Sequence, residues 1–319
     1  MLPLITLEEH YVSSALPPDA DDLASHMELP PQLQSKLLDL DAERIKDLDT
    51  GSISLQVLSH GPLDADASIC AKVNDELKAA ITKHPKRLAG FALLPMAEPE
   101  AAAKELERCT KNLGFLGALV DCHLHGRFYD DNFFWPVFAK AEELDVPIYI
   151  HPTFSSDAMM SHYRGNYDEK IASALSAFGW GWHSDTGLHF LKLYCAGLFD
   201  KFPKLKIVIG HMGEMLPFQF DRCVGVSQRM FPQHKRGLKE VWDENLWITT
   251  SGMFSLPPLK CLLEVKGKEK VLFSVDYPFS ANEKGRKFVE EIEASGILSE
   301  KELKAFGYGN AERLLKVKL

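Results

Sequence analysis

Apolar residues along the chain gather in short runs, and longer stretches of mixed apolar and polar residues separate them. The runs are rich in Val, Ile, Leu or Phe and lack strict alternation, which is typical of parallel strands covered on both faces. They comprise residues 4–9, 53–59, 88–94, 115–120, 146–150, 206–210, 246–250 and 271–275. The longer stretches have amphipathic patterns that predict helices, for example at residues 68–83, 98–111, 132–144 and 282–294.

Eight strands that alternate with helices predict an α/β fold, specifically a (β/α)8 barrel of the TIM type. A doubly wound sheet is the alternative, but it normally carries a glycine-rich phosphate loop after its first strand. Here the first run continues into Glu8-Glu9-His10-Tyr11, which cannot surround a pyrophosphate. No linker or internal repeat interrupts the pattern, so residues 1–319 are expected to form a single barrel domain. Its longer loops are expected after strands one and five, at residues 12–34 and 153–182.

The composition narrows the class of protein. Of the 319 residues, 45% are hydrophobic and 25% charged, which is ordinary for a globular chain with its own core. With 36 basic and 45 acidic residues the net charge is −9, so neither nucleic acid nor a membrane surface is expected as partner. Six scattered cysteines predict reduced thiols in a cytoplasmic protein. No signal peptide or transmembrane segment is expected, because a basic leader and a run of about 18 apolar residues are both missing.

Side chains that can bind metals follow several of the predicted strands. Glu8 and His10 end strand one, His151 ends strand five, and Asp276 ends strand eight. The carboxyl ends of barrel strands surround the active site, and closure makes strands one and eight neighbours, so these four side chains are expected to converge. Any one of them could merely cap its own strand, but four at strand ends favour a site. Two carboxylates and two imidazoles predict one divalent metal ion, zinc first, with manganese or magnesium as alternatives.

Other histidines lie close to predicted strand ends. His211 ends strand six and is expected beside the metal without binding it, with Glu214 fixing its tautomer. His123 and His125 form a competing His-x-His motif, but the glycine that follows indicates a loop, so they are expected at the pocket rim or facing solvent. His60 could line the pocket, although a position in a turn is favoured.

Three larger side chains are weaker candidates. Trp180 and Trp182 could border a flat aromatic ligand, but packing or a contact between subunits is favoured. Arg222 could bind a substrate carboxylate. The alternative for this arginine is an ion pair with Asp221 or with a neighbouring chain.

The motifs that contain these residues resemble those of the amidohydrolase superfamily, in its branch of non-oxidative decarboxylases. They are Leu-Glu8-Glu9-His10, Tyr-Ile-His151-Pro, Ile-Gly-His211-Met-Gly-Glu214, Trp-Ile-Thr-Thr-Ser-Gly at residues 247–252, Phe-Ser-Val-Asp276-Tyr-Pro-Phe279 and Gly-Asn310-Ala-Glu. The branch includes aminocarboxymuconate-semialdehyde decarboxylase and the ortho-hydroxybenzoate decarboxylases, and Glu8-x-His10 is similar to the γ-resorcylate (2,6-dihydroxybenzoate) group. Binuclear members carry a lysine at the end of strand four. Here Val120-Asp121-Cys122 stands instead, which implies one metal ion.

The resemblance implies a metal-dependent carboxy-lyase that removes CO₂ reversibly from an ortho-hydroxylated aromatic carboxylic acid. Asp276 would deliver a proton to the ring carbon, while His211 and Glu214 would steer that proton. The substrate would be contacted by His10, Phe279 and Arg222. A homodimer or homotetramer is also implied. The alternatives are a mononuclear hydrolase of a lactone, ester or amide, and a barrel retained only for binding.

Overall fold

The structure is a computed structural model that describes residues 2–17, 20 and 28–319. In this part of the chain eight parallel strands form two sheets, ordered β1-β2-β3 and β4-β5-β6-β7-β8. The strands are β1 (Leu4–Tyr11), β2 (Ile53–His60), β3 (Leu88–Gly90), β4 (Ala118–Asp121), β5 (Pro147–His151), β6 (Lys206–Ile209), β7 (Leu246–Thr249) and β8 (Val271–Leu272). Each predicted run overlaps one of these strands.

Two seams join the sheets into a closed barrel. At the first seam, Glu9 forms a parallel bridge with Tyr277, and the backbone N–H of His10 donates to the carbonyl oxygen of Tyr277 over 2.7 Å. At the second seam, Ala92 forms a parallel bridge with Ala118. The predicted (β/α)8 barrel is therefore confirmed, and its closure places the end of β1 beside the segment that follows β8.

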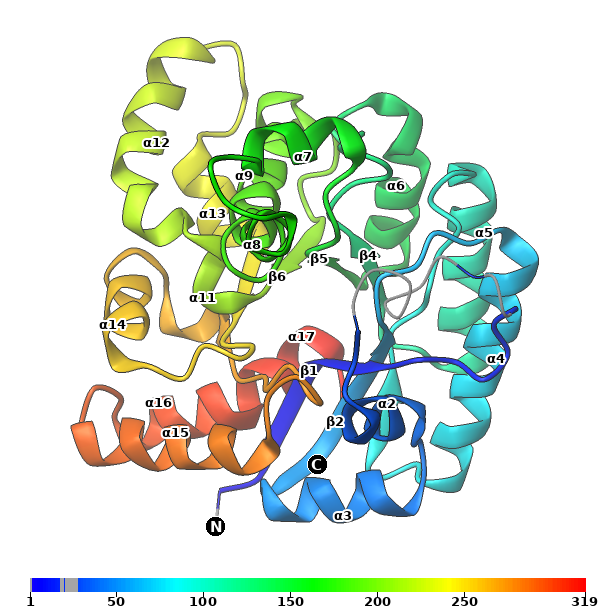
Figure 1. The fold of residues 1–319 in the computed structure, drawn as a ribbon. Helices are drawn as coiled ribbons and strands as arrows, with labels where there is room; N and C mark the ends of the chain where they lie inside the picture. The colour runs from blue at the N-terminus through cyan, green and yellow to red at the C-terminus, as the bar shows by residue number, and fades with distance from the viewer. Residues whose placement is uncertain (1, 18–19, 21–27) are drawn as a thin grey trace.

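Helices run along the outside of the ring of strands, as Figure 1 shows. The α-helices of the described residues are α2 (Pro31–Leu38), α3 (Ala42–Thr50), α4 (Ala67–Lys83), α5 (Pro99–Arg108), α6 (Trp135–Leu144), α7 (Asp157–Tyr163), α8 (Glu169–Ser176), α9 (Gly181–Cys195), α10 (Leu198–Lys201), α11 (His211–Glu214), α12 (Leu216–Met230), α13 (Leu238–Asn245), α14 (Leu256–Val265), α15 (Asn282–Ser295), α16 (Glu300–Lys304) and α17 (Asn310–Leu315). Shorter 3-10 or π turns are η1 (Cys109–Leu113), η2 (Asn132–Phe134), η3 (Lys268–Lys270) and η4 (Ala305–Gly309). Helices α4, α5, α6 and α15 confirm the four predicted amphipathic stretches.

Local signals explain where these helices begin. The Asp66 carboxylate accepts the first free backbone N–H groups of α4, from Ser68 and Ile69. Proline occupies the first position of α5, where its missing N–H costs nothing. The loop predicted at residues 153–182 instead contains α7 and α8, which are too short to produce a clear amphipathic repeat. The loop predicted at residues 12–34 falls partly outside the described residues, at 18–19 and 21–27.

The hydrophobic core has two layers. Apolar side chains from the strands fill the barrel interior and pack on α17, while a larger cluster lies between the strands and the surrounding helices. The turn η4, which leads into α17, touches Leu2 and Leu4, so this covering lies at the amino end of β1. The opposite end of the barrel is left for polar side chains. All six cysteines are free, as expected, and no described helix has the length and apolar character needed to cross a membrane.

Candidate active site

Three of the predicted metal-binding residues lie together at the carboxyl end of the barrel. Potential ligand atoms of Glu8, His10 and His151 lie within 4.8 Å of one another. The His10 and His151 rings meet edge to face with centroids 4.6 Å apart, and His151 Nε2 lies 3.4 Å from Glu8 Oε1. All three residues are buried. The convergence expected from the strand ends is therefore present for these three side chains.

A β-bulge in β1 directs Glu8 into the barrel. Thr6 pairs with Gln56 but Glu9 pairs with Leu58, so β1 contains one extra residue between these two points. A bulge of this kind re-aims the side chains that follow it. The Glu8 carboxylate consequently meets Tyr149, which belongs to the interior cluster, and accepts a hydrogen bond from the Tyr149 hydroxyl through Oε2. Thr249 Oγ1 is 2.7 Å from the same hydroxyl and 3.4 Å from Glu8 Oε2.

The donor set fits a divalent cation. Glu8 Oε1, both ring nitrogens of His10 and His151 Nδ1 are buried and have no hydrogen-bond partner among the described residues. Leaving such atoms unpaired costs about 1–3 kcal/mol each, so their clustering indicates a missing partner common to several of them. Burial raises the pKa of Glu8 and lowers that of His151, which keeps the imidazole in its neutral, metal-binding form. One carboxylate with two imidazoles is a ligand set that zinc and manganese accept.

Asp276, the fourth predicted ligand, borders this three-residue cluster. Its Oδ1 is 3.4 Å from His10 Nε2, and its Oδ2 is 3.9 Å from His211 Nε2. The backbone at Asp276 has φ +66°, a left-handed conformation that turns the chain away from β8 at this point. Burial alone would raise the pKa of Asp276, but its contacts with His10 and His211 hold the pKa well below its usual value.

Glu214 links two histidines in a hydrogen-bonded row. Its Oε1 is 2.7 Å from His211 Nδ1, and its Oε2 is 2.7 Å from His183 Nδ1. Burial would raise the pKa of Glu214, but the neighbouring His211 and the two hydrogen bonds lower it to about 2. Burial likewise opposes charge on His211, yet Glu214 and Glu8 raise its pKa well above the usual value. The expected contact between Glu214 and His211 is present, and it orients the ring. Because the raised pKa favours the imidazolium, which has a proton on both nitrogens, Glu214 stabilises that charge rather than selecting a tautomer.

The chain reaches this row through an unusual left-handed turn. Five successive residues have positive φ: His211 at +47°, Met212 at +58°, Gly213 at +91°, Glu214 at +51° and Met215 at +66°. For residues other than glycine this conformation costs roughly 1–2 kcal/mol each, and such strain is concentrated at functional sites. The turn directs the side chains of His211 and Glu214 toward each other and toward Asp276.

The other residues predicted to contact the substrate lie at different distances from the site. The Phe279 ring centroid is 5.8 Å from that of His10, and Phe279 is partly exposed, so it lies at the mouth of the site. Arg222 is not brought there. It is exposed on α12 and lines a separate groove against α9, because the helix directs it away from the barrel axis. No ion pair between Arg222 and Asp221 occurs in the described chain. Trp182 packs against Phe154, in line with the favoured interpretation.

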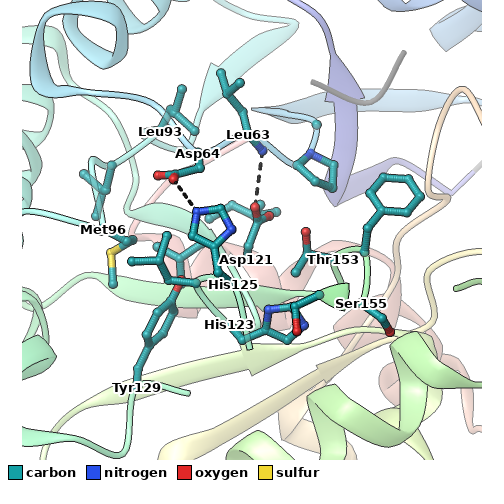
Figure 2. Close-up of a pocket in the computed structure, with 18 of the residues that line it drawn as sticks. Leu63, Asp64, Leu93, Met96, Asp121, His123, His125, Tyr129, Thr153 and Ser155 are labelled. Atoms are coloured by element: carbon teal, nitrogen blue, oxygen red, sulfur yellow. Dashed lines mark hydrogen bonds and ion pairs between the residues drawn. The ribbon is translucent and has the colours of Figure 1, made fainter. Parts of the chain in front are cut away.

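A cavity of about 480 Å³ lies at the carboxyl ends of β2 to β5 (Figure 2). Asp121 in its wall is paired with His151 of the candidate metal group. His60 borders the cavity, but as the last residue of β2 and not in the turn that was favoured. His123 also lines the cavity and is buried. Of the two positions expected for it, at the pocket rim or facing solvent, the second is therefore wrong. His125 lies at the rim, with Nε2 2.9 Å from Asp64 Oδ2. Asp121, which the sequence reasoning did not consider as a site residue, ends β4 in this cavity.

Two other residues of the site were missed from the sequence. His183 lies at the start of α9, directly after Trp182, and belongs to no recognisable motif. Tyr149 lies two residues before His151 within a run that reads as hydrophobic. The period of two along a strand places Tyr149 and His151 on the same face, and this was the signal that could have found Tyr149.

Comparison with known proteins agrees with this geometry. The family model described as Amidohydrolase matches residues 41–317, and the chain belongs to this family. Decarboxylase orsB of Emericella nidulans is 47% identical to this chain over 322 residues, which cover 99% of this chain and 97% of that protein. The γ-resorcylate decarboxylase of Polaromonas sp. is 35% identical and covers 98% of both chains. The predicted resemblance to the decarboxylase branch is thus confirmed.

Solved structures lead to the same branch. The dihydroxybenzoic acid decarboxylase of Polaromonas sp., with bound manganese and the inhibitor 2-nitroresorcinol, superposes with a TM-score of 0.88 at 34% identity. The match covers 99% of this chain and 97% of that one. A 5-carboxyvanillate decarboxylase of Novosphingobium aromaticivorans, complexed with manganese and a nitrobenzoic acid, gives 0.87 at 28% identity and covers 99% of this chain and 96% of that one.

Proposed function

We propose that the protein is a metal-dependent, non-oxidative decarboxylase of ortho-hydroxylated aromatic carboxylic acids. The observation that carries this proposal is the buried group of Glu8, His10 and His151 with Asp276 beside it at the mouth of the barrel. The similarity to γ-resorcylate and dihydroxybenzoate decarboxylases supports the choice of substrate class over a lactone, ester or amide.

Glu8, His10, His151 and Asp276 would hold one divalent metal ion. We infer zinc or manganese, because the ligand set suits both and two similar structures contain manganese. When bound, the ion supplies a positive centre for the carboxylate and the ortho-phenolate of the substrate. The protein's own side chains carry out the proton transfer, orient the reacting groups and exclude water.

The central step is protonation of the ring carbon that bears the carboxylate. Asp276 gains a proton from the ortho-hydroxyl as substrate binds, and transfers it to that carbon. The carbon–carbon bond then breaks, CO₂ leaves, and its bonding electrons restore the aromatic ring. His211, held by Glu214 through the 2.7 Å hydrogen bond, orients Asp276 from the other side. Phe279, beside His10, packs on the substrate ring and excludes water.

The test uses metal-loaded protein and a panel of hydroxybenzoates in D₂O. Release of CO₂ together with deuterium at the former carboxylate position is expected. A hydrolase would release no CO₂ and would leave the ring hydrogens unchanged. Turnover of esters or lactones with no CO₂ from any aromatic acid would contradict the proposal.

Replacing Asp276 tests the proton donor directly. The Asp276→Asn variant should retain metal at least in part, because the Glu8, His10 and His151 group remains. It should lose decarboxylation by at least about 100-fold, the lower range for a removed general acid. Metal content by elemental analysis and CO₂ release are the two measurements, and full activity would remove Asp276 from this role.

We further propose that the chain forms a homodimer or homotetramer. Helices α8, α9 and α12 and the segments around them expose an unusual number of large apolar side chains. These are Ile171, Leu175, Phe178, Trp180, Leu188, Phe218, Val226 and Met230. Light scattering on the purified protein measures the mass, and a monomer of 35.8 kDa at micromolar concentration would contradict this part.

A further inference from the structure

The cavity at the ends of β2 to β5 adjoins the candidate metal group through the pairing of β4 with β5. Asp121 of β4 pairs in register with His151 of β5, and paired residues on neighbouring parallel strands point to the same side of the sheet. Thr153, two residues beyond His151, also lines the cavity. A flat ligand whose carboxylate lies near His151 can therefore extend its opposite edge into this cavity.

Polar and apolar side chains share the cavity wall about equally. Figure 2 shows Leu93, Met96 and Tyr129 along one side and Thr153 and Ser155 on the other, with Asp121 and His123 between them. Such a surface suits the faces and edges of an aromatic ring. Of the polar side chains in this wall, His123 is buried with an unpartnered ring nitrogen, and Asp121 is paired in register with His151. These two side chains therefore bear most directly on where a polar substituent of that ring can lie.

His123 contributes an unused hydrogen-bond donor. Its Nδ1 accepts the backbone N–H of Gly126 over 3.2 Å, so in the neutral ring the proton is on Nε2. Burial lowers the pKa of His123 to about 4, which keeps the ring neutral. The residue is only 4% exposed, and Nε2 has no hydrogen-bond partner among the described residues.

Asp121 contributes an acceptor. Its Oδ2 accepts the backbone N–H of Leu63 over 3.2 Å, the Thr153 side chain is a further hydrogen-bond partner, and burial raises the pKa of Asp121 to about 7. Each carboxyl oxygen has two lone pairs, so the group can still accept a further donor. The mechanism proposed above does not use this carboxyl group. An acceptor and a donor side by side match a hydroxyl group, which donates one hydrogen bond and accepts others, better than they match a methyl group or a second carboxylate.

We infer that this cavity binds the far edge of the aromatic substrate, and that Asp121 and His123 together recognise a second ring hydroxyl remote from the carboxylate. The inference rests on the proposed function and makes its substrate class narrower. The preferred acid carries one hydroxyl beside the carboxylate and another at position 4 or 5.

The experiment compares kcat/KM for 2,4-dihydroxybenzoate, 2,6-dihydroxybenzoate and 2-hydroxybenzoate in the wild type, Asp121→Leu and His123→Phe. The kcat/KM of each variant for the 2,4-acid should fall about 10- to 100-fold, because the buried ring hydroxyl loses one of its two hydrogen-bonding side chains. Loss with the other two acids should stay within about twofold. Their hydroxyls all lie beside the carboxylate, and comparing variants with the wild type cancels the intrinsic reactivity of each acid.

Two further variants or measurements separate recognition from folding. Asp121→Asn keeps an oxygen for Leu63 N–H and retains a hydrogen-bonding group, so it should recover much of the preference for the 2,4-acid. Metal content and thermal midpoints are recorded for every variant. An equal loss with all three acids, or an unchanged preference for the 2,4-acid in both Asp121→Leu and His123→Phe, would overturn the inference.

Binding of simple phenols separates failure of this inference from failure of the proposed function. Calorimetry with metal-loaded protein compares resorcinol, which has two hydroxyls, with phenol. A preference for resorcinol that disappears in both variants supports the subsite even where no acid is decarboxylated. Decarboxylation of hydroxybenzoates without any such preference would overturn the subsite and leave the proposed function standing.

Discussion

Tyr149 holds the Glu8 carboxylate in place, and its replacement by phenylalanine should weaken metal binding. The Tyr149 hydroxyl donates to Glu8 Oε2, Thr249 Oγ1 is 3.4 Å from that oxygen, and the Ser251 hydroxyl also hydrogen-bonds the carboxylate. The change keeps the ring and removes one oxygen atom. Glu8 then keeps the contacts with Thr249 and Ser251 to fix the orientation of its second oxygen, Oε1, toward His151 and His211.

The size of the effect follows from the charge on Glu8. A hydrogen bond to a charged group contributes about 1.5–3 kcal/mol, and each 1.4 kcal/mol changes an equilibrium constant tenfold. If the whole contribution acts on the metal-bound state, affinity falls by about 10- to 100-fold. Residues that orient metal ligands typically have effects in this range.

The assay is a competition between metal-stripped protein and a chromophoric chelator, with zinc and with manganese. Tyr11→Phe is the matched control, because it also removes a buried tyrosine hydroxyl, the one that donates to Val73 O on α4 over 3.2 Å. An affinity in Tyr149→Phe within twofold of the wild type, or an equal loss in Tyr11→Phe, would refute the reasoning.

Two further predictions concern the same site. Glu214→Gln should flatten the dependence of the free energy of unfolding on acid pH. The folded-state pKa of Glu214, about 2, lies below the ordinary 4.5, so the ionised carboxylate stabilises the folded protein by on the order of 3 kcal/mol above pH 4.5. This stabilisation is lost as the pH falls toward 2. Urea denaturation between pH 5 and 3 measures this, and parallel curves for wild type and variant would contradict it. Gly210→Ala should lower metal affinity at least about tenfold, since a Cβ there would lie 2.4 Å from Glu8 Oε2. The control Gly225→Ala on α12 meets no atom within 4 Å and should bind metal normally, and equal affinities in both variants would count against the effect.

The barrel could be predicted from the sequence because each strand is covered on both faces and therefore reads as an apolar run. The ends of the strands were less certain. The run at residues 271–275 contains only two residues of β8, because the next residues leave the ladder to reach Asp276. Helices α7 and α8 were missed, since seven or eight residues give too few turns for a periodic pattern.

The grouping of Glu8, His10 and His151 could be predicted because barrel topology alone brings strand ends together. Tyr149 and His183 could not be found in that way. Their roles depend on contacts with residues far apart in the chain, such as Glu8 for Tyr149 and Glu214 for His183. The polar pair of Asp121 and His123 depends on the shape of a cavity, which no linear pattern encodes. Arg222 lies on α12 away from the site of its own chain, and this position could not be known from its neighbours in sequence.

The seam between β1 and the segment after β8 has a consequence for how the protein matures. Glu8 and His10 are synthesised more than 260 residues before Asp276 and Tyr277. Until that late segment docks, the bulged strand has no neighbour on its open side. A polypeptide that ends before this segment would lack both the seam and Asp276, so its site would be incomplete.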